Sequence, residues 1–357
     1  MLSSVLFTYA GNIHIHTLHS DGSGTITGIA ADAAAAGLRY IIITDHETLA
    51  GLPEEGFYRG VAVLVGAELN KESHHYLALG LKELVPGSET DPQQMVDRVR
   101  RAGGFGFIAH PFEKGSPYID GGKAYPWTRF PESGFAGLEI WNYSSFWRGR
   151  ATSIPRTLYW FFFNRKAAVD RPPPEGLVLW DRYTGSGLRV TAIGSSDAHA
   201  ARVGLACIPV EIFPYRFLFR TINTYLCFRE AMSSNFAEAK SQIYSALRGG
   251  HCFISFDQLH PGEGFSFSAF RGGSAAAAAI MGEEIGWQEG LNLKVRAPTG
   301  RSEIRIIKNG TLLCRHHGPE LIYPVEGPGV YRAEVYYRPL WRKARPWIYA
   351  NPIYLRS

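Results

Sequence analysis

The chain has 357 residues, of which 45% are hydrophobic and 19% charged, and this predicts a folded protein with one large domain and a smaller one. It has no apolar run near the ~18 residues of a membrane span, no signal-peptide pattern and no Cys-x-x-Cys pair, so we expect a cytoplasmic protein with reduced thiols. The net charge of +5 suits anionic substrates but is too small to indicate a nucleic-acid partner by itself.

The first predicted element is a strand at residues 11–16, where apolar and polar side chains alternate. This period of two places His14 and His16 on one face, about 7 Å apart at ~3.3–3.4 Å per residue. A glycine-rich turn then leads into a predicted alanine-rich helix at residues 25–36, which a glycine ends.

The later predicted strands share one design, an apolar run that ends in polar side chains able to bind a metal. A predicted helix at residues 91–102 separates two of them. The runs and their polar residues are 38–46 with His46, 61–70 with Glu68, 104–112 with His110, 134–142 with Glu139 and Asn142, and 188–199 with Asp197 and His199. Strands that alternate with helices in this way predict an α/β fold of the βα-barrel type, whose active site lies at the C-terminal rim of the strands.

Two aromatic and basic segments interrupt this pattern. Residues 144–183 predict an aromatic helix, a stiff proline linker near residues 171–174 and a second helix from Glu175. The other segment, residues 214–232, is also rich in aromatic and basic side chains. Both fit a lid, a dimer contact or ordinary packing of the barrel, and the sequence does not choose among these roles.

The sequence changes character near Phe256, where short β segments replace the alternation of strands and helices. Asn309-Gly310 lies between two apolar runs and is a strong hairpin signal. We therefore predict two domains, a barrel over residues 1–255 and a small all-β, sandwich-like domain over residues 256–357.

The polar residues at the predicted strand ends form a candidate metal site. Imidazole and carboxylate groups are the ligands that Zn, Mn and Fe use in proteins. Any one of these residues could be a hydrogen-bonded surface residue. That explanation does not account for so many of them at the rim of one predicted barrel. The candidate ligands are His14, His16, Asp21, His46, Glu68, His110, Asp197 and His199.

These motifs make the sequence similar to the PHP (polymerase and histidinol phosphatase) family of metal-dependent phosphoesterases. They occur in the family's order over residues 11–255 and read HIHTLHSDG, ITDH, GAELN, IAHPF, GLEIWN and GSSDAH. With a β-rich C-terminal part that ends in WIYANPIYL, the sequence resembles a bacterial subgroup defined by its likeness to a carbaryl hydrolase. The resemblance implies a distorted (β/α)7 barrel and a centre of two to three divalent ions of Zn, Mn or Fe.

The resemblance also implies how the ligands are shared. One metal takes His14, His16, Glu68 and Asp197, a second shares Glu68 as a bridge and takes His110, and a third takes Asp21, His46 and His199. Many family members give the second metal a further histidine or carboxylate, where this sequence reads Glu139-Ile140-Trp141-Asn142. We therefore expect a second metal that is under-coordinated by the protein, weakly held, or completed by water and substrate. We expect Glu139 to have an orienting role and Asn142 to contact the substrate. His19 and His75 fall outside the expected ligand set.

The activity that the resemblance implies is hydrolysis of a phosphate ester of a small molecule or nucleotide. Metal ions ~3.5–4 Å apart lower the pKa of bound water, and the resulting hydroxide attacks phosphorus in line. We expect Arg202 or Lys114 to neutralise charge on the phosphoryl oxygens. Either Asp197 or a metal-bound water then assists the leaving group.

Two other activities fit the same residues. A metal-activated hydroxide also hydrolyses a carboxylic ester, an amide or a carbamate. A nuclease would hold a nucleic-acid backbone with Arg148, Arg150 and Arg165 and would show a steep salt dependence, but nucleic acid is the less favoured partner. The sequence predicts no membrane partner and leaves oligomerisation open.

Overall fold

The computed structural model describes residues 6–205, 208–272, 276–341 and 343–357, excluding the side chains at 120, 166–167, 202–205 and 208–210. The fold is mixed α/β and divides into two compact units. The N-terminal unit comprises residues 10–177 and 193–223, and the C-terminal unit comprises residues 1–9, 178–192 and 224–357. These units differ in their bounds from the predicted domains 1–255 and 256–357, which stay a prediction about independent folding.

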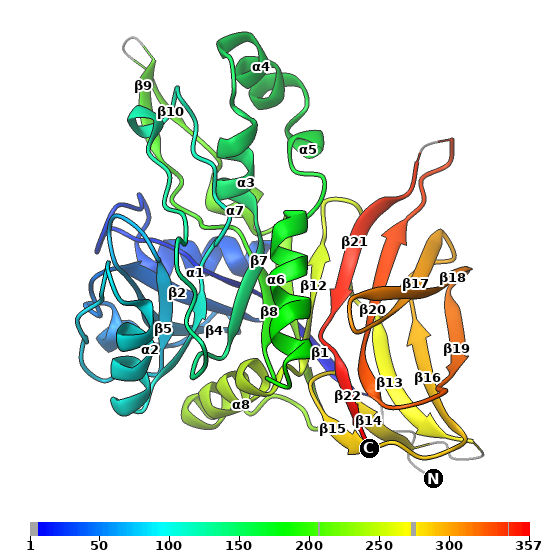
Figure 1. Ribbon diagram of the computed structural model, residues 1–357. Helices are drawn as coiled ribbons and strands as arrows, with labels where there is room; N and C mark the ends of the chain where they lie inside the picture. The colour runs from blue at the N-terminus through cyan, green and yellow to red at the C-terminus, as the bar shows by residue number, and fades with distance from the viewer. Residues whose placement is uncertain (1–5, 206–207, 273–275, 342) are drawn as a thin grey trace. The chain divides into compact units, whose positions relative to one another are not determined.

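The N-terminal unit is built from strands with helices between them in the chain (Figure 1). Its strands are β1 (Phe7–Ile13), β2 (Tyr40–His46), β3 (Gly56–Tyr58), β4 (Val61–Leu69), β5 (Tyr76–Leu79), β6 (Phe105–Ile108), β7 (Gly137–Asn142), β8 (Thr191–Ser195), β9 (Arg202–Leu205), β10 (Ile208–Glu211) and β11 (Ile222–Phe228). Its helices are α1 (Ile26–Ala35), α2 (Pro92–Arg101), α3 (Tyr143–Arg150), α4 (Ile154–Leu158), α5 (Arg165–Ala168) and α7 (Tyr215–Leu218), with the short turns η1 (Leu52–Glu54) and η2 (Asp120–Gly122) and the π-helix η3 (Tyr159–Phe163). Helix α6 (Pro174–Gly185) begins in this unit, and its residues from 178 onward belong to the C-terminal unit. The division between the units falls within β1, α6, β8 and β11.

The main sheet of the N-terminal unit has the strand order β1-β2-β4-β5-β6-β7-β8. Strands β1, β2 and β4 pair in parallel, as do β6 and β7, whereas β5 runs antiparallel to both β4 and β6. A parallel bridge joins Ile15, just after β1, to Ala198, just after β8. The backbone beyond the first strand therefore meets the backbone beyond the last one, which is the contact that the predicted barrel requires. The complete seven-stranded barrel stays a prediction.

The predicted helices at residues 25–36 and 91–102 are confirmed as α1 and α2. Thr25 and Asp91 cap them, because each side chain accepts a hydrogen bond from a backbone N–H of the first turn. The aromatic segment predicted at residues 144–183 contains α3, α4, η3, α5 and most of α6. Figure 1 shows α3, α4, α5 and the β9–β10 hairpin extending from the same end of the unit.

The C-terminal unit combines α8 (Phe236–Gly249) and the larger part of α6 with two sets of short strands. The strands are β12 (Cys252–Phe256), β13 (Ser266–Arg271), β14 (Ala277–Ile280), β15 (Glu284–Gly286), β16 (Leu291–Arg296), β17 (Ser302–Lys308), β18 (Thr311–His317), β19 (Glu320–Pro324), β20 (Gly329–Tyr337), β21 (Arg345–Ala350) and β22 (Ile353–Arg356). One sheet has the order β15-β22-β20-β21-β12, with β17 pairing β18 and β20, and the other has the order β14-β13-β16-β19.

Alternate residues of β13 and β16 are buried, so one face of their sheet packs inward, as a sandwich requires. The predicted hairpin is confirmed between β17 and β18, where Asn309 and Gly310 adopt φ values of 49° and 79°. Cys227, Cys252 and Cys314 are free thiols, and Cys207 lies outside the described residues. Within the described part of the chain, no helix is long and apolar enough to cross a bilayer.

Candidate metal centre

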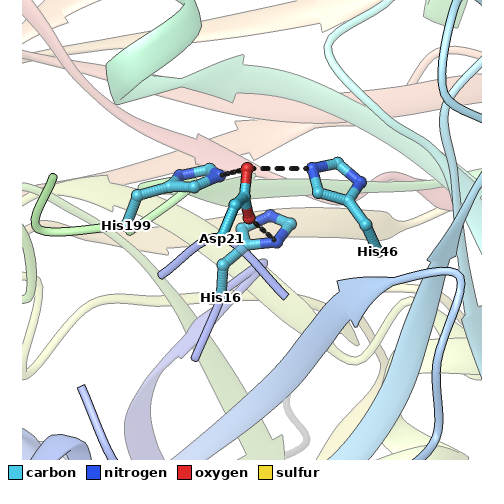
Figure 2. A group of neighbouring side chains, drawn as sticks. All are labelled: His16, Asp21, His46 and His199. Carbon is cyan, nitrogen blue, oxygen red and sulfur yellow. Dashed lines mark ion pairs between the residues drawn. The ribbon is translucent and has the colours of Figure 1, made fainter. Parts of the chain in front are cut away.

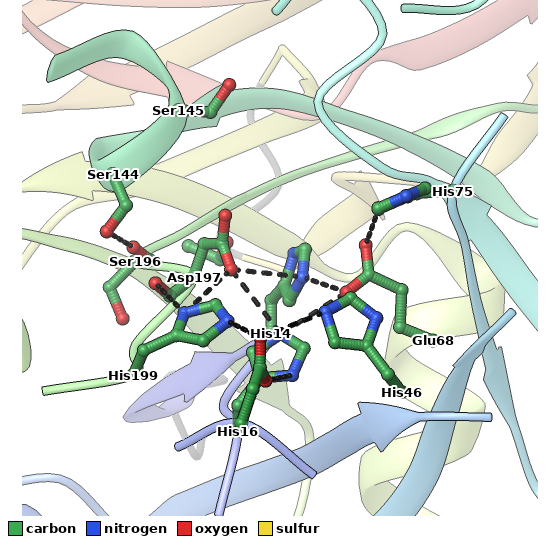
Figure 3. Close-up of polar contacts among 12 residues, drawn as sticks. His14, His16, His46, Glu68, His75, Ser144, Ser145, Ser196, Asp197 and His199 are labelled. Atoms are coloured by element: carbon green, nitrogen blue, oxygen red, sulfur yellow. Dashed lines mark hydrogen bonds and ion pairs between the residues drawn. The ribbon is translucent and has the colours of Figure 1, made fainter. Parts of the chain in front are cut away.

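The eight candidate ligands come together in the N-terminal unit, and Figure 3 labels six of them: His14, His16, His46, Glu68, Asp197 and His199. Five of them are imidazoles in direct contact with the carboxylate of Glu68 or Asp197, and the eighth, Asp21, contacts three of these imidazoles. The side chains that meet are His14, His16, Asp21, His46, Glu68, His110, Asp197 and His199. Strand ends that lie far apart in the sequence therefore form one polar cluster.

One part of the predicted first strand is wrong. Strand β1 ends at Ile13, because His14 adopts a left-handed φ of 70°. His110 and Asp197 also have positive φ values, of 25° and 52°. Such conformations are costly for residues other than glycine and cluster at functional sites. The backbone turns at these residues, and this brings their side chains into the cluster.

Glu68 lies at the centre, and its carboxylate is 1% exposed. Its Oε2 atom lies 3.0 Å from His14 Nε2, 3.2 Å from His16 Nε2 and 3.4 Å from His46 Nδ1. Asp197 Oδ1 faces two of the same nitrogens, at 3.4 Å from both His14 Nε2 and His16 Nε2. One carboxylate oxygen of Glu68, Oε2, therefore faces three imidazole rings.

The other oxygen of Glu68 faces a second pair of imidazoles, one of which the sequence analysis left out. Oε1 lies 2.7 Å from His75 Nδ1 and 3.2 Å from His110 Nε2. His75 precedes β5, which turns back antiparallel to β4 and so returns the chain to Glu68. A regular alternation of strands and helices does not predict this reversal of the chain. The signal that the sequence offered was the short separation of seven residues between Glu68 and His75.

A third group surrounds Asp21 (Figure 2). Its Oδ2 atom lies 3.3 Å from His199 Nε2 and 3.6 Å from His46 Nε2, and its Oδ1 atom lies 3.5 Å from His16 Nδ1. Each of these four side chains offers one ligand atom within 4.8 Å of the others. They could hold a metal ion together.

The described residues fit a cation in two respects. Ligand atoms that surround one ion at 2.0–2.2 Å in a tetrahedron lie roughly 3.4 Å apart, close to the spacings given above. Among the described residues, the buried nitrogens His16 Nδ1, His16 Nε2, His46 Nδ1 and His110 Nδ1 face carboxylate oxygens at 3.1–3.5 Å without forming a hydrogen bond, and His75 Nε2 also forms none. Nitrogens and carboxylate oxygens that lie close together without hydrogen bonds between them are arranged as the ligands of one cation are.

Glu139 lies behind His14 and holds it in position. Its Oε1 atom lies 3.1 Å from His14 Nδ1, and its Oε2 atom accepts hydrogen bonds from His110 N at 2.8 Å and from Asn142 Nδ2 at 3.0 Å. Ser195 Oγ donates to the same carboxylate. With Nδ1 fixed in this way, His14 directs Nε2 toward Glu68 and Asp197, as expected of an orienting carboxylate behind a ligand histidine.

Asn142, the predicted substrate contact, has structural partners. In addition to its contact with Glu139, its Oδ1 atom accepts a hydrogen bond from Ser145 N at 2.9 Å and caps α3. Its side chain also lines a cavity of about 370 Å³ beside the cluster. Its role toward a substrate stays a prediction.

Two buried side chains hold the loops that carry the ligands. The Tyr215 hydroxyl lies 2.8 Å from His16 O and 3.0 Å from His199 O, and it accepts hydrogen bonds from the backbone of the Gly22–Gly24 turn. Asp45 accepts hydrogen bonds from Thr17 N and Thr17 Oγ1, both at 2.7 Å, so it anchors the loop that leads to Asp21. Asp45 thus positions the backbone at Thr17 and not the imidazole ring of its neighbour His46.

The charges of the cluster stabilise one another. Burial disfavours charge on His16, yet the carboxylates of Asp197 and Glu68 raise the pKa of its imidazole to about 9. Burial also disfavours charge on Glu68, but His14 and the neighbouring imidazoles hold the pKa of its carboxyl well below its ordinary value. For His46 burial dominates and lowers the pKa to about 4. Metal ions bind neutral imidazoles, so loading the site must displace protons from His16.

A cavity of about 300 Å³, here called the metal pocket, opens onto the cluster. Besides candidate ligands, it is lined by Lys71, His75, Glu113, Tyr125 and Arg148. Of the two predicted phosphate-binding cations, Lys114 is 72% exposed and lies 3.9 Å from a carboxylate oxygen of Glu175. The side chain of the other, Arg202, lies outside the described residues.

Comparison with known proteins gives partial likenesses. No known family profile matches the sequence. A stretch of 84 residues is 34% identical to a phosphoribosyl 1,2-cyclic phosphate 1,2-diphosphodiesterase of Eggerthella lenta. The match covers 21% of this chain and 32% of that protein, so the chain spans about a third of the length of this curated relative.

Solved structures are similar at low identity. A two-domain protein of Bacteroides vulgatus that contains a predicted PHP-like metal-dependent phosphoesterase is 15% identical, with 97% of this chain and 95% of that chain covered at a TM-score of 0.47. An amidohydrolase of Chromobacterium violaceum with bound sulfate is 16% identical, with 53% and 87% covered at a TM-score of 0.31. Likenesses of this size carry no functional argument, so the function of this chain has to be inferred from its own side chains.

Proposed function

We propose that this protein is a metal-dependent phosphoesterase of the PHP family. The observation that carries the proposal is the position of Glu68, whose two oxygens face separate groups of imidazoles at 2.7–3.4 Å. A carboxylate in this arrangement can bridge two cations ~3.5–4 Å apart, the spacing typical of two-metal sites that act on phosphoesters. The partial relative from Eggerthella lenta is a diphosphodiesterase by name, which supports the same type of bond.

The proposed ligand sets follow from the contacts. The first ion would take His14, His16 and Asp197 with Oε2 of Glu68, the second would take Oε1 of Glu68 with His75 and His110, and the third would take Asp21, His46 and His199. His75 supplies the protein ligand that the sequence lacked for the second ion. Mixed imidazole and carboxylate donors suit Zn, Mn or Fe better than Mg or Ca.

Bound divalent ions would supply water activation and neutralise negative charge on the phosphoryl group. The chain's own residues fix where this happens. Glu139 orients His14, and Tyr215 holds the backbone of His16 and His199 in register. A site held by buried neighbours in this way does not reorganise during the reaction, which is the basis of electrostatic catalysis.

The size of the metal pocket supports a small substrate. About 300 Å³ is at the lower end of the range for small-molecule sites, so it suits a phosphate ester of a small molecule or nucleotide better than a duplex. The pocket volume does not favour a carboxylic ester, amide or carbamate over a phosphoester. These substrates therefore belong in the experiment.

The test uses alanine variants of His14 and Asp197. Both should lose hydrolysis of an activated ester such as p-nitrophenyl phosphate or bis(p-nitrophenyl) phosphate while keeping a native circular dichroism spectrum. The matched control is His19→Ala, because His19 is on the same loop but pairs with Glu54 at 2.8 Å outside the cluster. Unchanged turnover in both site variants would refute the assignment, and hydrolysis restricted to p-nitrophenyl acetate or a carbamate would refute the substrate class.

A further inference from the structure

One wall of the metal pocket is cationic and aromatic. Arg148, Lys71 and Tyr125 line it together with the candidate ligands. The Tyr125 ring contacts the imidazole of His75 in a tilted arrangement, with ring centroids 4.6 Å apart and an interplanar angle of 36°. The guanidinium carbon of Arg148 lies 5.4 Å from the Tyr125 ring centroid, and Lys123 Nζ lies 5.1 Å from it. Positive charge is therefore held next to the side chains proposed to bind the second ion.

Arg148 is held in this position by Glu113. Glu113 Oε1 lies 2.9 Å from Arg148 Nη1, and Glu113 Oε2 lies 3.1 Å from His110 Nδ1. Arg148 Nη2 also donates a hydrogen bond to Lys123 O at 2.7 Å. Because the Glu113 carboxylate is 1% exposed, it fixes the guanidinium relative to a candidate metal ligand. The Arg148 side chain keeps 20% of its surface exposed, on the side of the pocket.

The neighbouring arginine on the same helix has a different environment. Arg150 Nη2 donates to Asp170 Oδ1 at 2.9 Å, and its guanidinium lies 5.1 Å from the Phe146 ring centroid. Arg150 lines the cavity of about 370 Å³ and not the metal pocket. Of these two arginines of α3, Arg148 lines the metal pocket and Arg150 lines the other cavity.

We propose that Arg148, positioned by Glu113, binds the phosphoryl oxygens of the substrate at the rim of the metal pocket, with Lys71 as a second and weaker cation. The inference rests on the proposed function and adds the residue that recognises the anion. A guanidinium presents several N–H donors in a plane that matches two phosphate oxygens, which an exposed lysine does not. Arg148 thus takes the role that the sequence analysis gave to Arg202 or Lys114.

The experiment measures binding of inorganic phosphate to the manganese-loaded protein by titration calorimetry, with bound manganese determined for each variant. Arg148→Met should weaken phosphate binding on the order of tenfold or more, the loss expected for a charge-assisted hydrogen bond, with bound manganese unchanged. Arg148→Lys should recover part of the affinity, because it restores the charge without the planar donors. Arg150→Met should bind phosphate as the wild type does, and Lys71→Met should weaken binding about two- to threefold.

Three results would overturn the inference. The first is phosphate affinity unchanged in Arg148→Met at full manganese content. The second is loss of manganese from Arg148→Met and Arg148→Lys alike, which would make Arg148 a support for His110. The third is an equal loss of affinity in Arg150→Met, which would indicate a general effect of charge. Binding does not depend on turnover, so a protein that binds phosphate through Arg148 but hydrolyses no ester would refute the proposed function and leave this inference standing.

Discussion

Each unit of the protein buries a cluster of charged groups, and the two clusters are built in opposite ways. In the C-terminal unit, Arg332 donates to Asp181 through Nε at 3.1 Å and through Nη2 at 2.9 Å, and its Nη1 contacts Glu334. The guanidinium also lies 5.3 Å from the Trp180 ring centroid. The N-terminal cluster contains imidazoles and carboxylates in place of a guanidinium, and buried ring nitrogens in it have no hydrogen-bond partner among the described residues.

We interpret the first cluster as structural and the second as the proposed metal site. Asp181 and Glu334 raise the pKa of Arg332 further, so this arginine stays charged and its partners are satisfied within the protein. The pKa values of the imidazoles around Glu68 are shifted in both directions, to about 9 for His16 and about 4 for His46, and neutral imidazoles can bind a metal ion. We therefore expect changes in the first cluster to affect stability and changes in the second to affect metal binding and catalysis.

The largest effect on activity is expected from Glu68→Gln. The amide cannot bridge two cations as a carboxylate does, so hydrolysis of an activated phosphoester should fall on the order of 10³-fold or more. Steady-state kinetics measure this fall. The control is Glu54→Gln, because the Glu54 carboxylate pairs with His19, which lies outside the proposed ligand sets. A Glu68→Gln protein with wild-type kcat/KM would contradict the proposal that the cluster around Glu68 is needed for activity.

The largest effect on stability is expected from Arg332→Met. Removing one partner of a buried ion pair leaves Glu334 without its counter-charge, which lowers the free energy of unfolding by ~3–5 kcal/mol. Urea unfolding measures this loss, and the content of bound metal should not change. Arg356→Met is the control, because its contact with Glu284 is exposed and is worth ~0–1 kcal/mol. Loss of metal from folded Arg332→Met would show that the two clusters are not independent in function.

A smaller effect is expected from pH on the metal-free protein. The pKa of His16 in the folded chain is about 9, above its ordinary value of 6.5, so charged His16 contributes its full stabilisation below pH 6.5. This contribution is lost as the pH rises through 9. Urea midpoints of the chelator-treated protein should therefore fall between pH 6.5 and 9, and Glu68→Gln should reduce the fall. A midpoint that rises over this range would contradict the charge balance described for the cluster.

The sequence predicted which side chains come together, because most of the candidate ligands follow strands. His14, His16, Glu68 and Asp197 were predicted as one group, and their nitrogen and oxygen atoms lie within 3.0–3.4 Å of one another across the group. The left-handed turn at His14 was not predictable, since the alternation of residues 11–16 reads as a continuous strand.

The sequence could not predict contacts that depend on chain reversal or on distant packing. His75 enters the cluster because β5 runs antiparallel to β4, and a regular strand–helix repeat gives no sign of this. Arg148 faces the metal pocket because Glu113, 35 positions earlier in the chain, holds its guanidinium. The C-terminal unit also takes in residues 178–192 and 224–255, because their packing partners are strands that lie later in the sequence.

The most direct test of the central claim is the number of metal ions bound to the folded wild-type chain. The purified protein should be loaded with Mn or Zn, dialysed and analysed for metal and for activity on a phosphoester. Our account predicts more than one equivalent per chain and loss of activity when a chelator removes the metal. A protein that stays folded and fully active with no bound metal would contradict it.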